Sequence, residues 1–259
     1  MAQTALITGA SSGIGAAFAR ALARRGDHLI LVARSEDKLE ALAESLRGEQ
    51  AVTVTVVAAD LSLPGCGVRL AAELAGRGLA VDVLINNAGF GSAGAFAQQD
   101  PARDAEMIGL NVAAVVDLAH AFLPAMLERR RGCILNVASV AGFQPLPQMA
   151  IYAATKAFVL SFSEALWAET RGSGVRVTAL CPGPVDTPFF EATGTPELRK
   201  AVPKGFMMTA EEVAAEALSA LAAGRPVVVP GVGNKLLSVV PRLLPRRWMT
   251  LASGKAMAR

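Results

Sequence analysis

The chain has a single tyrosine, Tyr152, which lies four residues before Lys156 in the segment Tyr-Ala-Ala-Thr-Lys. Residues four apart on a helix share a face, so the phenol and the ammonium group are expected to project side by side. A phenol with a pKa of ~10 is a poor acid–base catalyst near neutral pH, but a cation within ~4–6 Å favours the phenolate and lowers that pKa. The pair predicts a proton donor and acceptor tuned by the lysine; the alternative is an exposed helical pair.

A glycine-rich turn follows the first apolar run of the chain. Residues 8–15 read TGASSGIG, and a helical pattern begins directly afterwards. Glycine permits a tight turn and close approach of the backbone to phosphate, while a helix amino terminus presents unpaired N–H groups and the positive end of its dipole. The turn predicts a pyrophosphate cradle. A purely structural turn is the alternative, because Phe18 departs from the GxGxxG spacing.

Apolar, β-rich runs alternate with longer helical patterns along the chain. The expected strands are residues 4–8, 28–33, 52–58, 81–86, 133–138, 175–180 and 226–229. The expected helices are residues 14–25, 36–47, 68–77, 101–129, 152–170 and 211–223. This alternation predicts an α/β protein with a doubly wound Rossmann fold, in which helices flank a seven-stranded, mostly parallel sheet. Ligands of such sheets bind at the carboxyl ends of the strands, where the winding direction reverses.

Length and composition indicate one large domain. The 259 residues contain no linker or charge run, so we expect a domain at residues 1–233 and a basic amphipathic extension at 234–259. The longest stretch without charge, residues 132–155, contains Pro145 and Pro147 and does not resemble a membrane span. The first residues enter a strand without a leader pattern, which predicts a cytoplasmic protein.

Cysteine and histidine are too scattered to predict a disulfide framework or a metal site. Three cysteines, Cys66, Cys133 and Cys181, form an odd and widely spaced set that fits a reducing compartment. The two histidines, His28 and His120, lie apart from each other and from every cysteine.

Several motifs together resemble the short-chain dehydrogenase/reductase family. They occur in the family's order, at predicted strand ends or on helices, between residue 4 and about residue 230. They are the TGxxxGxG turn, Asn86-Asn87-Ala88-Gly89, Asn111, Ser139 in NVASVAG, Tyr152 with Lys156, and Pro182-Gly183-Pro184. The chain looks most like the broad group of bacterial members of unassigned substrate. One departure is Ala138, which replaces a serine that often precedes the catalytic one.

The resemblance implies a catalytic set of four residues. Tyr152 would be the general acid in reduction and the base in oxidation, and Lys156 would hold down its pKa and bind the nicotinamide ribose. Ser139 would donate a hydrogen bond to the substrate oxygen. Asn111 would hold a water that links Lys156 to solvent; its alternative is an asparagine that bends the helix through backbone hydrogen bonds.

The resemblance also implies the residues that bind the cofactor. Asp60 would hold the adenine amino group, although an aspartate there could equally cap a turn. The remaining expected contacts line the pyrophosphate, the ribose and the carboxamide. They are Gly9, Ser11, Ser12, Gly13, Ile14, Gly15, Leu61, Asn87, Ala88, Gly89, Pro182, Gly183, Val185 and Thr187, together with Tyr152 and Lys156.

Arg34 closes the second predicted strand, where the residue that reads the ribose belongs. An acidic residue there would bind the 2′-hydroxyl of NAD, whereas a guanidinium suits a 2′-phosphate. NADP is therefore favoured over NAD. The alternative is a solvent-exposed arginine, because Ser12 fills another position that is often basic in NADP users.

The substrate is expected to be a small carbonyl or alcohol compound, with a mild preference for an apolar one. Residues 188–208 occupy the place of the family's variable lid, with Phe189 and Phe190 at its start, and Phe143 and Met149 could complete the wall beside Ser139. The first hypothesis is an NADP-dependent oxidoreductase, with a membrane-proximal 3-oxoacyl or hydroxysteroid reductase as the alternative within enzymes. A non-catalytic dinucleotide-binding redox sensor is the alternative from another class.

The C-terminal tail is basic and apolar. Residues 217–259 contain seven Lys or Arg and no Asp or Glu, whereas the first 216 residues carry a net charge of −4. Leucines and Trp248 fall on one helical face with Lys235, Arg242 and Arg246 opposite, and Pro241 and Pro245 should interrupt a continuous helix. A membrane surface, a neighbouring subunit or local packing remain open. We expect a homodimer or homotetramer, and no nucleic-acid partner.

Overall fold

The computed structural model describes residues 2–195, 197–202 and 205–257. Seven strands form one sheet in which every neighbouring pair is parallel, in the order β3-β2-β1-β4-β5-β6-β7. The strands are β1 Thr4–Thr8, β2 His28–Ala33, β3 Val54–Ala58, β4 Val83–Asn86, β5 Gly132–Val137, β6 Val175–Leu180 and β7 Val227–Val228. The doubly wound prediction is confirmed, and the sheet is wholly rather than mostly parallel.

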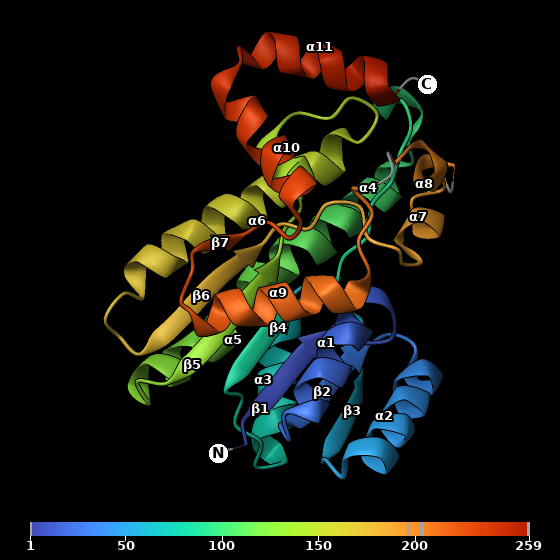
Figure 1. Ribbon diagram of the computed structural model, residues 1–259. Coiled ribbons are helices and arrows are strands. Elements are labelled where there is room, and N and C mark those ends of the chain that lie inside the picture. Colours follow the sequence, from blue (N-terminus) through green and yellow to red (C-terminus); the bar gives the residue numbers. More distant parts are fainter. Residues whose placement is uncertain (1, 196, 203–204, 258–259) are drawn as a thin grey trace.

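Helices cover both faces of this sheet (Figure 1). The longer helices are α1 Gly13–Arg24, α2 Glu36–Gln50, α3 Cys66–Gly76, α4 Pro101–Ile108, α5 Ala114–Glu128, α6 Ala150–Glu169, α9 Ala210–Ala222, α10 Val232–Leu243 and α11 Arg246–Met257. The short ones are the 3-10 turns η1 Phe96–Gln98 and η3 Val140–Phe143, the π-helical turn η2 Gly109–Ala113, and α7 Phe189–Ala192 and α8 Leu198–Ala201.

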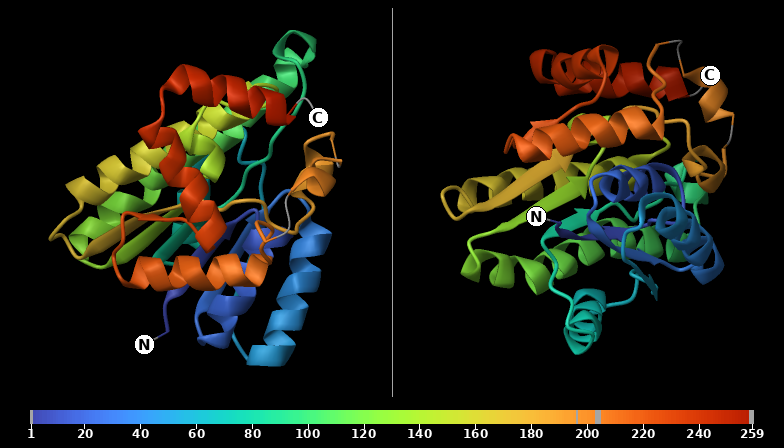
Figure 2. Two further views of the ribbon diagram at one scale, coloured as in Figure 1. Left: turned by 45° about the horizontal axis from the view of Figure 1, so that its top comes forward. Right: turned by 60° about the horizontal axis from the view of Figure 1, so that its bottom comes forward.

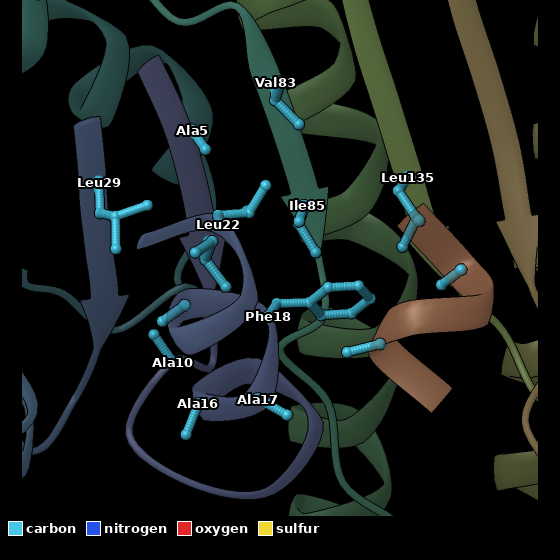
Figure 3. Close-up of a cluster of buried hydrophobic side chains, with 14 of the residues drawn as sticks. Ala5, Ala10, Ala16, Ala17, Phe18, Leu22, Leu29, Val83, Ile85 and Leu135 are labelled. Carbon is cyan, nitrogen blue, oxygen red and sulfur yellow. The ribbon is translucent and has the colours of Figure 1, made fainter. Parts of the chain in front are cut away.

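Strand residues alternate between two cores. In β1, Ala5 and Ile7 face one side and pack with α1, α2 and α9, whereas Leu6 faces the other side and packs with α3, α5 and α6. Both sides are apolar because both faces of a parallel sheet are covered by its crossover helices. Figure 3 shows the first core, where the ring of Phe18 on α1 points toward Ile85 of β4.

The predicted helix at residues 101–129 is helical throughout but is not one regular α-helix. The five-residue π turn η2 separates α4 from α5 and has Asn111 at its centre. A π turn inserts one residue into the helical ladder and often marks a functional position. The span Pro101–Glu128 is long and apolar enough to cross a membrane. It belongs to the domain, however, because Leu118, Phe122 and Met126 are buried in the second core.

The tail forms two helices rather than one. Pro245 separates α10 from α11, as the sequence predicted, whereas Pro241 lies inside the last turn of α10. α10 begins at Val232, slightly before the predicted boundary at residue 234. Figure 2 shows both helices, in red, on the outside of the domain.

Candidate active site

A cavity of about 600 Å³ lies at the carboxyl ends of the strands. Its walls come from the segments that follow β1 through β6, so it includes the β1/β4 boundary, where the order of the sheet reverses. This is the position predicted for a ligand of a doubly wound fold. The volume lies within the ~300–1,000 Å³ typical of small-molecule sites.

The glycine turn after β1 lines one end of this cavity and leaves no room for a side chain at Gly9 or Gly15. Gly9 has a φ of +64° and Gly13 a φ of +55°, which favour glycine at both positions. A Cβ on Gly15 would lie 2.2 Å from the carbonyl oxygen of Gly9. Because the first turn of α1 contains no acidic residue, its N–H groups and dipole are available to an anion. The cradle fits a pyrophosphate.

Asn87 shapes this turn through its side chain. The amide nitrogen of Asn87 donates to the carbonyl oxygens of Thr8 at 2.9 Å and Gly9 at 3.2 Å. The Thr8 hydroxyl accepts in return from the backbone N–H groups of Asn87 and Ala88, both at 2.9 Å. Asn87, Ala88 and Gly89 line the cavity as predicted, and Asn87 also holds the adjacent strand end in place.

Ser139, Tyr152 and Lys156 meet at the other end of the cavity. Ser139 ends the segment after β5 and caps η3, where its hydroxyl oxygen accepts from the N–H of Ala141 at 3.1 Å. Its hydroxyl proton therefore remains available to donate, and Ser139 also shares a hydrogen bond with Tyr152. Tyr152 and Lys156 lie on one face of α6, with the Lys156 Nζ 5.9 Å from the centre of the Tyr152 ring. All three are buried.

The pKa of Tyr152 shifts in the direction opposite to that predicted. Burial raises it from 10.0 to about 12, and the hydrogen bond with Ser139 only partly offsets this effect. The prediction rested on the nearby cation, which lowers the pKa of a phenol. Loss of water around the phenolate raises that pKa and is the larger effect. Within the protein alone, Tyr152 is therefore a protonated phenol.

Burial also acts on Lys156. Its ammonium group donates to the carbonyl oxygen of Val137 at 2.8 Å, which turns it toward the carboxyl end of β5. Removal from water lowers its pKa from 10.5 to about 8, although Cys181 acts in the opposite direction. A lysine with this pKa exchanges its proton near neutral pH.

Asn111 is buried in the π turn and holds the backbone of the loop after β4. Its Oδ1 accepts from the N–H of Phe90 at 3.1 Å, and its Nδ2 donates to the carbonyl oxygen of Phe90 at 2.9 Å and to Thr155 at 3.1 Å. Asn111 does not line the cavity. The alternative interpretation, that it serves backbone hydrogen bonds in an irregular helix, describes these contacts, and its water-holding role stays a prediction.

The residues after β2 and β3 line the end of the cavity beyond the glycine turn. Asp60 accepts from the N–H and hydroxyl of Ser62 at 2.9 and 2.7 Å, which lowers its pKa, so it caps a turn while facing the cavity. Arg34 is exposed and pairs with Glu106 at 3.0 Å. Lys38, in the first turn of α2, lines the same wall. Lys38 was not predicted, although it lies only four residues after Arg34 in the sequence.

The segment after β6 closes the cavity from a third side. Thr187 lies against Gly13, where an added Cβ would come within 3.2 Å of it. Gly183 lies against Asn234 of α10, and Val185 forms an isolated bridge with Met208. Pro182, Gly183, Val185 and Thr187 all line the cavity, as predicted.

The wall beside Tyr152 is apolar. The ring of Phe189 lies 5.4 Å from that of Tyr152, and Phe190 and Met149 complete part of the wall. The structure adds residues that the sequence analysis did not single out for this wall. These are Phe90, Leu146, Ala192 and Thr193. The prediction for Phe143 is wrong: it does not line the cavity and packs instead against a core cluster that includes Val159 and Leu160.

The segment of α7 that carries this wall is tied to the domain. Arg103 of α4 donates to the carbonyl oxygen of Ala192 at 2.6 Å and lies 5.0 Å from the centre of the Phe90 ring. The N–H of Ala93 donates to the carbonyl oxygen of Thr193 at 3.2 Å. The apolar wall is thus held by α4 and by the loop after β4.

Comparison with known proteins places this arrangement in a family. The model of the short chain dehydrogenase family matches residues 3–197. The chain belongs to this family. As a short-chain dehydrogenase it is an oxidoreductase, and its site fits a nicotinamide dinucleotide.

Individual relatives differ in what they bind. This chain is 32% identical over 249 residues to 17-beta-hydroxysteroid dehydrogenase type 3 of Rattus norvegicus. The alignment covers 95% of this chain and 78% of that protein. A short-chain dehydrogenase from Sphingobium yanoikuyae, solved with NADPH, is 38% identical with a TM-score of 0.82 over 93% of this chain and 94% of that one. A short-chain dehydrogenase/reductase from Burkholderia phymatum, solved with NAD, is 31% identical and has a TM-score of 0.84. The superposition covers 93% of this chain and 92% of that one.

Proposed function

We propose that the protein transfers hydride between NADP(H) and a ketone or secondary alcohol of largely apolar character. The observation that carries this proposal is the meeting of Ser139, Tyr152 and Lys156 in one buried corner of a cavity whose other end is the glycine turn. A substrate oxygen in that corner would lie within reach of two hydroxyl donors. The bound cofactor would supply the hydride donor or acceptor.

Each of the three residues has a separate task in this proposal. Ser139, whose oxygen already accepts from Ala141, donates a hydrogen bond to the substrate oxygen and orients it, while keeping its proton. Tyr152, held as a phenol by burial, protonates that oxygen during reduction and takes the proton back during oxidation. Lys156, whose pKa burial lowers to about 8, holds its ammonium group 5.9 Å from the centre of the Tyr152 ring. It returns the proton that Tyr152 gives up and takes a replacement from solvent.

Two cations support NADP over NAD. Arg34 and Lys38 both line the wall where the adenosine ribose would lie, and no acidic residue stands at the end of β2. A guanidinium and an ammonium together suit a phosphate, whereas the 2′-hydroxyl of NAD needs an acceptor. The relative from Sphingobium yanoikuyae, solved with NADPH, supports this choice.

The apolar wall favours a bulky substrate. Phe90, Leu146, Met149, Phe189 and Phe190 surround the corner that holds Tyr152. Such a wall suits a hydrocarbon ring or chain next to the reacting carbonyl. The relative named as a hydroxysteroid dehydrogenase makes a hydroxysteroid type of substrate the most specific version of this proposal, with a 3-oxoacyl compound as its alternative.

A non-catalytic redox sensor remains the competing class, and it makes a different prediction. A sensor would bind the dinucleotide but would have no need of a buried phenol and serine that share a hydrogen bond. Tyr152→Phe separates the two, because it removes only the hydroxyl. General acid catalysis contributes roughly 10²–10⁴-fold, so we expect turnover to fall at least about a hundredfold while NADPH binding stays within about twofold.

The experiment is a screen of apolar ketones with NADPH and of the matching alcohols with NADP, followed by nicotinamide absorbance. The wild type and Tyr152→Phe are compared on every substrate that turns over. Val68→Gln, an exposed change on α3 far from the cavity, is the control for handling. Turnover by Tyr152→Phe at more than a tenth of the wild-type rate would remove Tyr152 from the mechanism. NADPH binding without turnover of any substrate would favour the sensor.

A further inference from the structure

The two C-terminal helices present their large apolar side chains to solvent and their small or polar ones to the domain. In α10, Asn234 and Ser238 are buried, although Leu236 between them is 64% exposed. In α11, the hydroxyl of Ser253 donates to the carbonyl oxygen of Pro145 at 3.1 Å, and Gly254 lies against Pro147. This is the reverse of a surface helix in a globular protein, which buries its apolar face.

The exposed apolar residues of α10 form a continuous stripe. They are spaced 4, 3 and 4 residues apart, which places them on one face over three turns of helix. They are Val232, Leu236, Val239 and Leu243, and all four are exposed. Leu237 and Leu244 widen this stripe on one side, and Trp248 and Leu251 of α11 are also exposed. A monomer in water gains nothing from such a surface, so it indicates a partner.

The charge around these side chains narrows the choice of partner. Residues 232–259 contain six Lys or Arg and no Asp or Glu. Lys235 lies beside the stripe in the helical repeat, and Arg246 and Arg247 begin α11 next to Trp248. All three side chains are exposed. A second copy placed on this face by a two-fold axis would bring two cationic surfaces together, and like charges oppose that contact.

We infer that α10 and α11 bind the surface of a bilayer that contains anionic phospholipid. Leucine, valine and tryptophan on one face with lysine and arginine at its edge is the pattern of a helix that lies in the plane of a membrane interface. The headgroups supply the negative charge that the protein lacks there, and the acyl boundary covers the apolar stripe. The inference rests on the tail alone and does not depend on the proposed reaction.

The position of α10 and α11 places a bound membrane near the cavity. α10 and α11 lie at the end of the molecule opposite the amino terminus (Figure 1), and α11 packs on the loop at Pro145 and Pro147. Leu146 of that loop lines the cavity. A bilayer bound to the tail therefore lies close to the apolar wall of the site, which suits a substrate that partitions into lipid.

Vesicle flotation tests the inference with the full-length protein. Phosphatidylcholine vesicles are compared with vesicles that also contain phosphatidylserine, at ~0.05 M and ~1 M salt, because the Debye length falls to ~3 Å at 1 M. We expect flotation with the anionic vesicles at low salt, and at least about tenfold weaker binding at high salt or without phosphatidylserine. Absence of flotation with anionic vesicles at low salt overturns the inference.

Two pairs of substitutions test the surface itself. Leu236→Gln/Leu243→Gln removes half of the stripe, and Arg246→Glu/Arg247→Glu reverses two charges, each worth about fivefold in binding. We expect each pair to weaken flotation at least about tenfold. The matched controls, Val68→Gln on α3 and Arg20→Glu/Arg24→Glu on α1, change exposed residues of the same kinds elsewhere and should float as the wild type. Equal loss in the controls, or none in the tail variants, overturns the inference.

Tryptophan fluorescence adds a direct readout. Trp248 is exposed, whereas Trp167 donates from its ring nitrogen to the carbonyl oxygen of Gly224 within the domain. We expect emission to move to shorter wavelength on anionic vesicles in the wild type but not in Trp248→Phe, which still floats.

Light scattering of Leu236→Gln/Leu243→Gln tests whether a second copy of the chain covers this face instead. A lower mass than that of the wild type would assign the face to a second copy and overturn the membrane contact.

Discussion

Lys156 shows how one buried side chain sets the behaviour of the site. Its ammonium group is removed from water and held by the Val137 carbonyl, so the charged form that the proposed mechanism uses is also a form that the fold disfavours. Buried charges of this kind reduce stability, and proteins keep them where they serve a function. The balance between these two effects depends on pH.

A stability measurement against pH detects this burial. The pKa of Lys156 is lowered to about 8, so between about pH 8 and pH 10.5 the unfolded chain binds one more proton at this residue than the folded protein does. Stability from this residue therefore increases as the pH rises through that range. Relative to Lys156→Met, the wild type should gain roughly 1–2 kcal/mol in free energy of unfolding between about pH 7.5 and about pH 9.5.

Urea unfolding of the two proteins at several pH values provides the test. A constant difference for Lys156→Met would mean that Lys156 is hydrated in the folded protein.

Coenzyme choice is also decided by single residues. If Arg34 holds the 2′-phosphate, the wild type binds NADPH more tightly than NADH, and Arg34→Asp reverses that order. A hydrogen bond to a charged group is worth ~1.5–3 kcal/mol, which is roughly ten- to a hundredfold in dissociation constant. Equal affinity of the wild type for both coenzymes in a fluorescence titration would contradict the NADP proposal.

Glu106 gives a finer test of the same contact. Its carboxylate pairs with Arg34 at 3.0 Å and would compete with a phosphate for the guanidinium. Exposed ion pairs are worth at most about 1 kcal/mol, so we expect Glu106→Gln to tighten NADPH binding by up to about fivefold and to leave NADH unchanged. Weaker NADPH binding in this variant would mean that the ion pair positions Arg34 for the phosphate.

Residue-level prediction from the sequence succeeded where a motif determines the placement. Ser139, Tyr152 and Lys156 meet because a strand end and one face of a helix bring them together. It failed where burial and packing decide: the Tyr152 pKa rises because water is excluded, and Phe143 packs into a core cluster instead of the cavity wall. Neither effect can be read from spacing alone.

At the scale of elements, α10 and the turn after β6 are packed closely enough to depend on each other. A Cβ on Gly183 would lie 2.2 Å from the Oδ1 of Asn234. Asn234 is buried, and its Nδ2 donates to the carbonyl oxygen of Pro230 at 3.1 Å, while its Oδ1 has no hydrogen-bond partner among the described residues. The tail helix thus fills the space behind a segment that lines the cavity.

This contact predicts a non-additive pair of substitutions. Gly183→Ala should weaken NADPH binding at least about tenfold, because overpacking costs about 1–3 kcal/mol and displaces the turn. Asn234→Ala alone should have a smaller effect, of about 1 kcal/mol, because its Nδ2 donates at 3.1 Å to Pro230 and only weakly, at 3.4 Å, to Phe206. The double variant should bind NADPH better than Gly183→Ala, with a coupling of about 1 kcal/mol or more. Additive effects in the titrations would show that the turn moves without meeting Asn234.

Element boundaries followed from the sequence wherever apolar periodicity was strong. The strands agree within two residues, because a parallel strand buried on both faces is a continuous apolar run. The π turn at Asn111 was not predicted, since an inserted residue leaves the apolar pattern of the long helix nearly unchanged. The outward-facing stripe of α10 escaped prediction too, because periodicity shows that a helix is amphipathic but not which side faces the domain.

The homo-oligomer stays a prediction, and the structure identifies the exposed apolar residues that could form its contact surface. Leu160 and Leu166 of α6 are buried in the domain and do not supply a surface. Phe158 is 41% exposed and stacks on Phe162 at 5.8 Å, and Leu127 of α5 is 39% exposed. These residues leave an apolar surface on α5 and α6. We expect a second copy of the chain to cover this surface in a homodimer or homotetramer.

Phe158→Glu tests this assembly. A charge at the centre of an apolar contact should lower the mass measured by light scattering at micromolar concentration, because a buried charge without a partner is costly. Phe96→Glu changes a more exposed phenylalanine, on η1, and should leave the mass unchanged. A monomeric wild type would refute the assembly, and an unchanged mass for Phe158→Glu would place the contact elsewhere.

The packing of α1 against α9 has a consequence for biosynthesis. Phe18 of α1, labelled in Figure 3, is fully buried. Its cluster includes Val213, Ala214 and Ala217 of α9. During translation α1 emerges about 200 residues before α9, which at ~5–20 residues per second is ~10–40 s. Throughout that interval α9 is not yet there to cover the apolar side chains of α1, Phe18 among them. Chaperone binding to ribosome-bound chains should therefore persist until α9 has left the exit tunnel.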